Sequence, residues 1–248
     1  MLTLSDLETG FREIGLFPGM FLEVHSSLSS FGNVQGGADT INDALQKIIT
    51  SQGAIIMPSF PMTKPLPLTE EDKARGITYK IRMLDPLADE PSGMGIVADT
   101  FRRRTDVQTG EGLFRVSAWG AEQEANSQGF TNLHEHDGHA LLLGVDIYRL
   151  TSMHYVESIL PQAVRAYGNP SPEIQALYPK VDWYVQTRDT PILGWYTIQD
   201  QAFQRGYITE MRIGQARCLF FKVNSVIGLY REALQQDPFG LFGLSEPA

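Results

Sequence analysis

The sequence is poor in cysteine and in positive charge, and it has no long hydrophobic run. Its single cysteine, Cys218, excludes an internal disulfide framework and a cysteine-based zinc site. Lys and Arg number 20 against 29 Asp and Glu, and the resulting net charge of −9 argues against nucleic acid as a partner. No apolar stretch is long enough to span a membrane, and MLTLSDLETGFREIG lacks the pattern of a signal peptide. We therefore expect a cytoplasmic protein.

The size and composition are those of an ordinary globular protein. A length of 248 residues, 42% of them hydrophobic, is compatible with one large α/β domain that buries a substantial core. The acidic balance is compatible with a cationic substrate, because a negative cleft concentrates cations, although it is explained as well by solubility alone.

Hydrophobic periodicity predicts an alternation of helices and strands. The predicted helices begin near Ser5, with Ser5 and Glu8 as a capping box, and cover 38–49, 95–104, 151–159 and a last segment capped by Ser225. The predicted strands are 21–24, 54–57, 139–145, 183–186 and 218–223. This alternation indicates an α/β fold with three αβα layers around a mixed central sheet. Prolines interrupt a loop-rich insertion at about 59–94, which we expect to form a second lobe of a single domain spanning residues 1–248.

A serine- and glycine-rich turn follows the first predicted strand, in VHSSLSSFGNVQGG at 24–37. Such a turn before a helix presents backbone N–H groups that bind anions, and glycines allow a ligand to approach closely. The spacing is neither that of a P-loop nor GxGxxG, which argues against a nucleoside triphosphate or a dinucleotide. By glycine content alone, a structural turn is the favoured interpretation.

Five segments in order resemble the aminoglycoside 3-N-acetyltransferases, which do not have the GNAT fold. They are VHSSLSSFGNVQGGADTINDAL (24–45), AIIMPSF (54–60), LDPLADEPSGMGIVADTFRR (84–103), GHALLLGVDIYRLTSMHYVE (138–157) and GQARCLFF (214–221). The resemblance implies an acyltransferase that moves the acetyl group of acetyl-CoA onto an amine of an aminoglycoside or related amino sugar. It also implies that the cofactor lies along the first segment, at His25, Ser26, Ser27, Leu28, Gly32, Val34, Gly36 and Gly37. A structural role for His25 stays open.

His154 and Glu157 are the candidate catalytic residues. A spacing of three places both side chains on one face of a helix. A neutral histidine can take a proton from an amine, and a carboxylate can fix its tautomer. By residue type alone His154 would more often be structural, but the resemblance implies that it is the base. Glu157 would orient it or bind the substrate ammonium. Because Cys218 lies in a predicted buried strand, we expect direct transfer rather than an acyl-enzyme.

The acceptor side departs from the family pattern. Glu111-Gly112 stands near the place where relatives have His-Pro, and we predict that Asp99 and Glu111 contact the substrate, with a solvated helix position as the alternative for Asp99. A nucleotide-linked amino sugar or a biosynthetic amine is the alternative acceptor, with Arg115, Lys80 and Arg82 as candidate basic residues. A non-catalytic CoA-binding protein is the second alternative.

Other partners and ligands follow from the same patterns. The partner is expected to be a small-molecule amine, without nucleic acid or membrane, and a homodimer is among the expected assemblies. No metal is expected, since HEHDGH at 134–139 indicates a connecting loop rather than an HExxH helix. A role in antibiotic resistance and a biosynthetic role both stay open.

Overall fold

The computed structural model describes residues 1–85, 90–189 and 192–246, so part of the predicted insertion, 86–89, lies outside the described residues. A seven-stranded sheet has the order β4-β5-β2-β1-β6-β9-β8. The strands are β1 (Phe21–Ser26), β2 (Ala54–Pro58), β4 (Gln108–Thr109), β5 (Val116–Gly120), β6 (His139–Leu143), β8 (Thr209–Ile213) and β9 (Ala216–Lys222). β1 lies at the centre, parallel to β2 and β6, while the outer strands are antiparallel. The predicted mixed sheet is confirmed.

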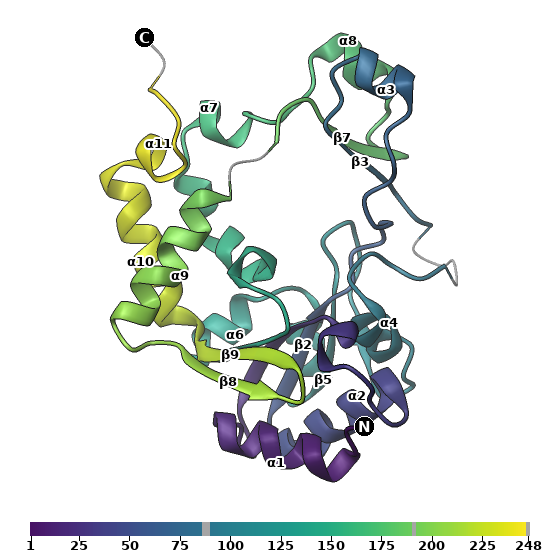
Figure 1. The fold of residues 1–248 in the computed structure, drawn as a ribbon, viewed down its shortest axis with the longest axis vertical. Coiled ribbons are helices and arrows are strands. Elements are labelled where there is room, and N and C mark those ends of the chain that lie inside the picture. The colour runs from purple at the N-terminus through teal and green to yellow at the C-terminus, as the bar shows by residue number, and fades with distance from the viewer. Residues whose placement is uncertain (86–89, 190–191, 247–248) are drawn as a thin grey trace.

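Helices cover both faces of this sheet (Figure 1). One face packs against α1 (Leu4–Ile14), α2 (Gly37–Ile49) and α4 (Ile96–Arg102). The other packs against α6 (Thr131–Glu135), α9 (Leu193–Gln204), α10 (Val223–Gln236) and the 3-10 helix η3 (Thr151–Ile159). Side chains alternate along a strand, so Leu22 and Val24 enter the first layer while Phe21 enters the second. The predicted three-layer αβα fold is confirmed.

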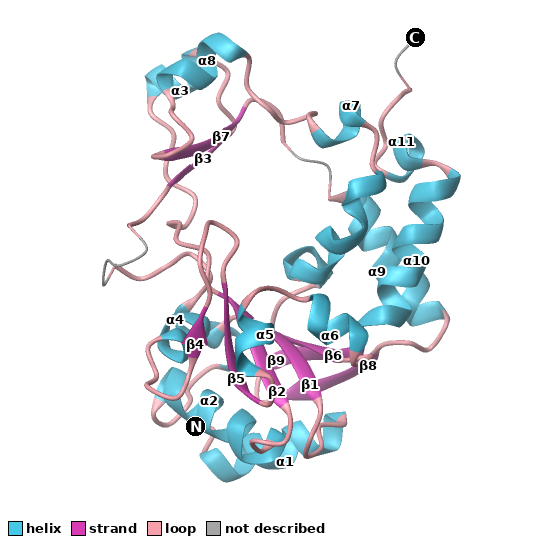
Figure 2. Ribbon diagram, turned by 180° about the vertical axis from the view of Figure 1, so that it is seen from behind, coloured by secondary structure: helices cyan, strands magenta, loops and turns pink. Residues whose placement is uncertain are grey.

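A small lobe, made of α3 (Glu70–Ala74), β3 (Tyr79–Arg82), α8 (Pro172–Leu177) and β7 (Trp183–Gln186), stands apart from the sheet (Figure 2). β3 and β7 form a separate antiparallel pair. The predicted strand 183–186 is therefore confirmed, and it belongs to this second sheet. The lobe therefore combines residues of the insertion with the later segment that contains α8 and β7. That residues 1–248 act as one domain stays a prediction.

Buried Asp72 organises the small lobe. It is 1% exposed and accepts hydrogen bonds from the Tyr178 hydroxyl at 2.6 Å and from Lys80 Nζ at 2.9 Å. Burial by itself would raise the pKa of Asp72, but these hydrogen bonds and those from Thr69 outweigh it and hold the pKa well below the ordinary 3.8. The carboxylate is thus fully charged and fully partnered.

Two predicted helix starts are wrong. Thr3, not Ser5, caps α1, since its side chain accepts from Asp6 N–H and the Asp6 carboxylate accepts from Thr3 N–H. Ser225 does not cap α10, because β9 runs directly into this helix at Val223 and leaves no loop residue to act as a cap. The remaining short helices are η1 (Leu28–Phe31), α5 (Gln123–Ser127), η2 (Ile147–Arg149), α7 (Gln162–Arg165) and α11 (Pro238–Leu241). Among the described residues, the helices lack the combination of length and apolar character that crossing a bilayer requires.

Candidate active site

His154 and Glu157 form a hydrogen-bonded pair on η3, with 2.5 Å between Nδ1 and Oε2. A 3-10 helix has about three residues per turn, so side chains three positions apart lie directly above one another. The predicted shared helix face is therefore confirmed, and the 3-10 geometry aligns the two side chains. The His154 side chain is 56% exposed and that of Glu157 only 22%. The imidazole is therefore accessible to a ligand, while the carboxylate is largely covered by protein.

Two aromatic residues from α9 and α10 hold this pair. The Tyr230 hydroxyl donates to Glu157 Oε1 at 3.1 Å and accepts from Trp195 Nε1 at 3.0 Å. The Trp195 ring meets the His154 ring edge to face, with 5.2 Å between centroids. Burial and the Glu157 charge raise the pKa of Tyr230, so its fully buried hydroxyl keeps its proton and donates it.

The electrostatic surroundings favour the charged form of His154. Burial works against protonation, but the hydrogen bond to Glu157 and the negative charges of Glu157 and Glu23 outweigh it. The pKa of His154 is therefore raised above its ordinary value of 6.5. A group whose pKa lies near the working pH is suited to taking up and releasing a proton.

His25 lies inside the protein, against Thr151 at the start of η3. It is 7% exposed, and its Nε2 lies 2.7 Å from Glu23 Oε1. Of the two readings left open for His25, these contacts favour the structural one.

The glycine turn follows the end of β1, the strand whose Glu23 and His25 contact the start of η3. Ser26 ends the strand, Ser27 precedes η1, and Leu28 is the first residue of η1. Neither η1 nor α2 has a side-chain cap on its first turn. Gly37 N–H donates to Val34 O at 3.1 Å. Helix starts are places where anions bind in proteins, and an anion at this turn stays a prediction.

The turn depends on its glycines. Gly32 and Gly36 have φ angles of 77° and 76°, in the left-handed region. A Cβ on Gly36 would lie 2.3 Å from Thr40 Oγ1, and one on Gly32 would lie 3.1 Å from the Gln215 side chain. Gly37, at φ 63°, begins α2. Val34 forms a bridge with Leu2, which ties the turn to the start of the chain.

The structure corrects the prediction for Asp99. This residue is 3% exposed and accepts from Arg102 Nε at 2.8 Å, Arg103 Nε at 3.1 Å and Ser92 N–H at 3.2 Å. Its charge is used to join α4 to the insertion, so it does not attract a substrate cation. Glu111, in contrast, is exposed on the loop between β4 and β5.

The candidate basic residues for an anionic acceptor already have partners. Lys80 pairs with Asp72, Arg82 Nη2 lies 2.6 Å from Glu90 Oε1, and Arg115 Nε donates to Ser59 O at 2.8 Å. These contacts weigh against a nucleotide-linked acceptor.

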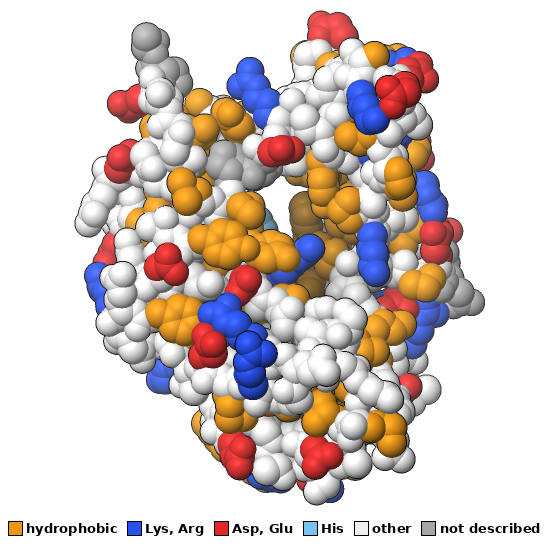
Figure 3. Space-filling model, viewed as in Figure 1, with side chains coloured by type: hydrophobic (Ala, Val, Ile, Leu, Met, Phe, Trp, Pro, Cys, Tyr) orange, Lys and Arg blue, Asp and Glu red, His pale blue; other side chains and the backbone are white. Residues whose placement is uncertain are grey.

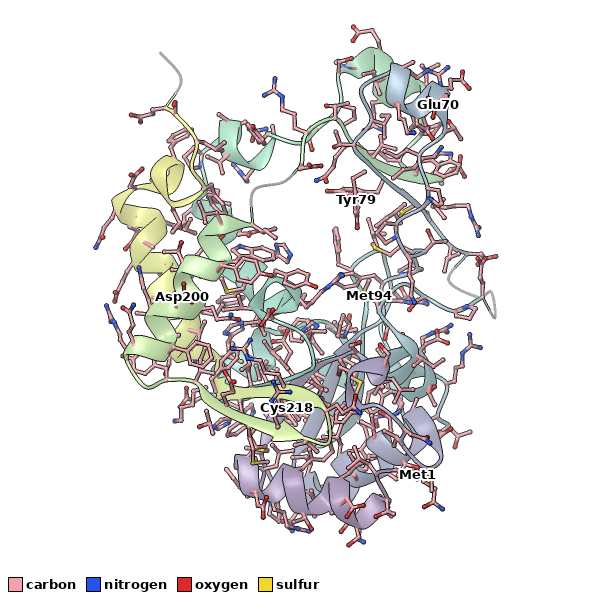
Figure 4. All side chains as sticks on the ribbon, viewed as in Figure 1. Met1, Glu70, Tyr79, Met94, Asp200 and Cys218 are labelled. Carbon is pink, nitrogen blue, oxygen red and sulfur yellow. The ribbon has the colours of Figure 1, made fainter. Side chains whose placement is uncertain are left out.

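A central hollow separates the small lobe from α9 and η3, and mainly hydrophobic side chains with some Lys and Arg surround it (Figure 3). Tyr79 and Met94 lie on one side of this hollow, opposite the helix that carries Asp200 (Figure 4). Tyr79 meets Tyr184 edge to face at 6.2 Å. Two other depressions, beside α5 and between α3 and α7, contain neither His154 nor the glycine turn. The central hollow is therefore the candidate acceptor site.

Other nucleophile and metal candidates have different surroundings. Cys218 is fully buried, and burial raises the pKa of its thiol to about 12. In HEHDGH, His134 Nδ1 bonds Asn224 Oδ1 at 2.9 Å, and His136 pairs with Glu122 at 3.1 Å. The first residues of this run end α6, which sequence analysis had assigned to a loop. Across 1–85, 90–189 and 192–246, no three or more His, Cys, Asp or Glu side chains gather as metal ligands would.

Sequence analysis missed three residues of this site. Glu23 carried a signal, because an acidic side chain in the middle of a buried strand is rare unless it is paired. Tyr230 lies in the predicted last helix, and Trp195 was not singled out. Neither carried a local signal, since both reach the site through long-range packing.

The fold and the site together define a class of protein: a three-layer α/β protein with a glycine-rich turn after its central strand β1 and a hydrogen-bonded histidine–carboxylate pair on η3. The family model described as aminoglycoside 3-N-acetyltransferase matches residues 24–235, and the chain belongs to this family.

Named relatives are about a quarter identical to the chain over the aligned segments. The SPbeta prophage-derived aminoglycoside N(3')-acetyltransferase-like protein YokD of Bacillus subtilis (strain 168) is 26% identical over 187 residues, covering 64% of this chain and 66% of that protein. Aminoglycoside N(3)-acetyltransferase IV of Salmonella sp is 27% identical over 170 residues, covering 63% and 58%. The matched segments thus span less than two thirds of these relatives.

Solved structures share the fold over nearly the whole chain. The apoenzyme of aminoglycoside acetyltransferase AAC(3)-IVa superimposes with a TM-score of 0.72 at 20% identity, covering 99% of this chain and 92% of the other. A binary complex of AAC-IIIb with CoASH gives 0.67 at 17% identity, covering 99% of each.

Proposed function

We propose that the chain transfers an acetyl group from acetyl-CoA directly to an amine of an aminoglycoside or related amino sugar. The observation that carries this proposal is the His154–Glu157 pair at 2.5 Å, on a helix whose first turn is bonded to β1, the strand that leads into the glycine turn. Family membership supports the reaction. Structural relatives described with CoASH, with apramycin and with sisomicin support the two ligands by analogy.

His154 acts as the base. Its Nδ1–H donates to Glu157, which leaves the Nε2 lone pair to take a proton from the acceptor amine. Glu157 then stabilises the imidazolium, and Tyr230 keeps the carboxylate in place. Bound acetyl-CoA supplies the acetyl group as a thioester.

The turn after β1 binds the donor. The first N–H groups of η1 and α2 receive the diphosphate, with Gly32, Gly36 and Gly37 allowing close approach. The side of the hollow that includes the exposed loop with Glu111 meets the acceptor. Transfer is direct because the thiol of Cys218 is buried and protonated.

The test is acetylation of a panel of aminoglycosides and amino sugars, followed by thiol release from acetyl-CoA and by mass spectrometry of the product. We expect an N-acetylated product, retained in the presence of EDTA. If no acceptor in the panel gives an amide, the proposal is wrong. Product from a nucleotide-linked amino sugar alone, with inhibition by a nucleoside diphosphate, would establish the alternative acceptor. Binding of CoA with no product anywhere would indicate the non-catalytic alternative.

A further inference from the structure

Glu23 is a fully buried carboxylate in the central strand β1, with an exposed fraction of 0%. It pairs in register with Ile56 of β2 and Ala140 of β6, so apolar strands flank it on both sides. A buried charge is costly unless it is well hydrogen-bonded. Its partners therefore show what this carboxylate does.

The carboxylate has two partners: Ser152, in the first turn of η3, and His25, on β1 itself. Glu23 Oε1 accepts from Ser152 N–H at 3.2 Å, and Oε2 accepts from the Ser152 hydroxyl. His25 Nε2 lies 2.7 Å from Oε1 of the same carboxylate, and Thr151 N–H points at this nitrogen from 3.3 Å. η3 has no side-chain cap of its own. Glu23 thus satisfies the N–H of Ser152 near the start of η3. His25 Nε2 lies between Glu23 and Thr151 N–H, and it either donates to the first or accepts from the second.

The negative charge of Glu23 also favours the protonated form of His154. The groups that face His154 are Glu157 of its own helix, Glu23 of β1 and Tyr230 of α10, with Trp195 of α9 uncharged. Burial lowers the pKa of His134 on the neighbouring α6, so that ring adds no positive charge at neutral pH. Glu157 and Glu23 both favour the imidazolium.

We propose that Glu23 is a positioning residue for acetyl transfer, which caps η3 from within the sheet and places a negative charge under His154. Through this carboxylate the strand that leads into the glycine turn also fixes the helix that carries the base. The inference rests on the proposed function for its kinetic part, whereas its effect on His154 does not require turnover.

The test is titration of His154 by NMR in the ligand-free protein, with the His154 signal assigned by its loss in His154→Ala. Glu23→Gln keeps the shape and removes the charge, so we expect the pKa of His154 to fall. Glu23→Asp keeps a charge on a shorter side chain, so we expect a pKa close to wild type. Asp72→Asn is the matched control, because it neutralises another buried carboxylate in the small lobe and should leave the pKa of His154 unchanged.

Kinetics test the capping role. Once an acceptor is known, Glu23→Gln should lower kcat by about tenfold, with a KM for acetyl-CoA close to wild type. An unchanged His154 pKa in Glu23→Gln would overturn the proposal, whether or not any acceptor is found. If Glu23→Gln does not fold, Glu23→Asp decides. A fall in the His154 pKa in Glu23→Asp as large as the fall in Glu157→Gln would show that the charge of Glu23 is not what acts, and would overturn the proposal. Absence of acetylation by the wild type together with a shifted pKa would reject the proposed function alone.

Discussion

At the scale of single residues, the site depends on a chain of contacts that begins at an exposed imidazole and ends in the core. His154 bonds Glu157, Glu157 bonds Tyr230, and Tyr230 bonds Trp195. Exposure falls along this chain from His154 to Tyr230, so the outer group can react while the inner groups keep it oriented. Substitutions of the outer and of the inner residues in this series of contacts should therefore have different effects on the reaction.

The pH dependence of the reaction should report His154. Since its pKa is raised above 6.5, the base is protonated on the acid side, and kcat/KM should rise with pH through that raised pKa. Glu157→Gln removes the hydrogen bond and charge that raise it. We expect the acidic limb of kcat/KM in this variant to move to lower pH, and its plateau to fall by about 100-fold. A limb at the wild-type pH would remove His154 from the reaction.

Tyr230→Phe should reduce both stability and rate. It removes the Tyr230 hydroxyl from Glu157 Oε1 and from part-buried Trp195 Nε1, at a cost of about 1–3 kcal/mol in the free energy of unfolding. The rate should fall because Glu157 is free to turn away from His154. Tyr207→Phe, at a side chain that is 40% exposed, is the control and should change neither. Chemical denaturation and kcat measure the two effects, and full activity of Tyr230→Phe would contradict this assignment.

At the scale of elements, the start of α2 is a turn that accepts few substitutions. Gly36 is left-handed and a Cβ there would overlap Thr40, whereas Gly37 is left-handed with no atom within 4 Å of its Cβ position. The two glycines therefore separate backbone strain from steric overlap. They also flank the proposed diphosphate site.

Gly36→Ala should weaken acetyl-CoA binding more than Gly37→Ala. Both pay about 1–2 kcal/mol for the left-handed backbone, and only the first must also displace Thr40. We expect the KM for acetyl-CoA, or the Kd by calorimetry, to rise by about tenfold in Gly36→Ala. Restoration by Thr40→Ala in the double variant would show the overlap itself, because this substitution removes the hydroxyl oxygen that a Cβ on Gly36 would meet. Equal effects of the two single variants would count against it.

Local patterns in the sequence were enough for elements whose cause is local. The apolar periodicity of α2, the hydrophobic run of β2 and the spacing of His154 and Glu157 all depend on neighbours within a few residues. The cap of α1 was misplaced by two residues, because Thr3/Asp6 and Ser5/Glu8 have the same spacing and only the backbone decides between them. The contacts of Glu23 with Ser152 join positions far apart, so a single sequence shows the unusual residue but not its partner.

At the scale of the whole molecule, the small lobe and the sheet contribute different parts of the proposed site. The glycine turn follows β1 of the sheet and the base lies on η3, which packs on the sheet, while the small lobe forms the far side of the hollow (Figures 1 and 3). Its pairing of β3 with β7 could not be predicted, because it joins the insertion to a segment beyond η3. A substitution that destabilises the small lobe should therefore leave acetyl-CoA binding unchanged.

Asp72→Asn should loosen the small lobe. Breaking a buried pair costs about 3–5 kcal/mol, and we expect faster proteolysis within residues 62–84 and 169–187. Because the pKa of Asp72 is depressed, its contribution is present above pH 3.8 and is lost as the pH falls below that value, so the wild-type lobe should open first in acid. The KM of the acceptor should rise while acetyl-CoA binding stays near wild type. Loss of acetyl-CoA binding in parallel would show that the two halves do not separate.

The two-segment construction of the small lobe has a consequence for engineering. A specificity-determining part encoded by one continuous insertion could be exchanged between relatives with a single replacement. Here β3 and β7 come from opposite sides of the segment that carries His154 and Glu157. A chimera with a new acceptor side would therefore need two coordinated crossovers, and a single crossover would leave each half of the lobe with a partner strand from the wrong parent.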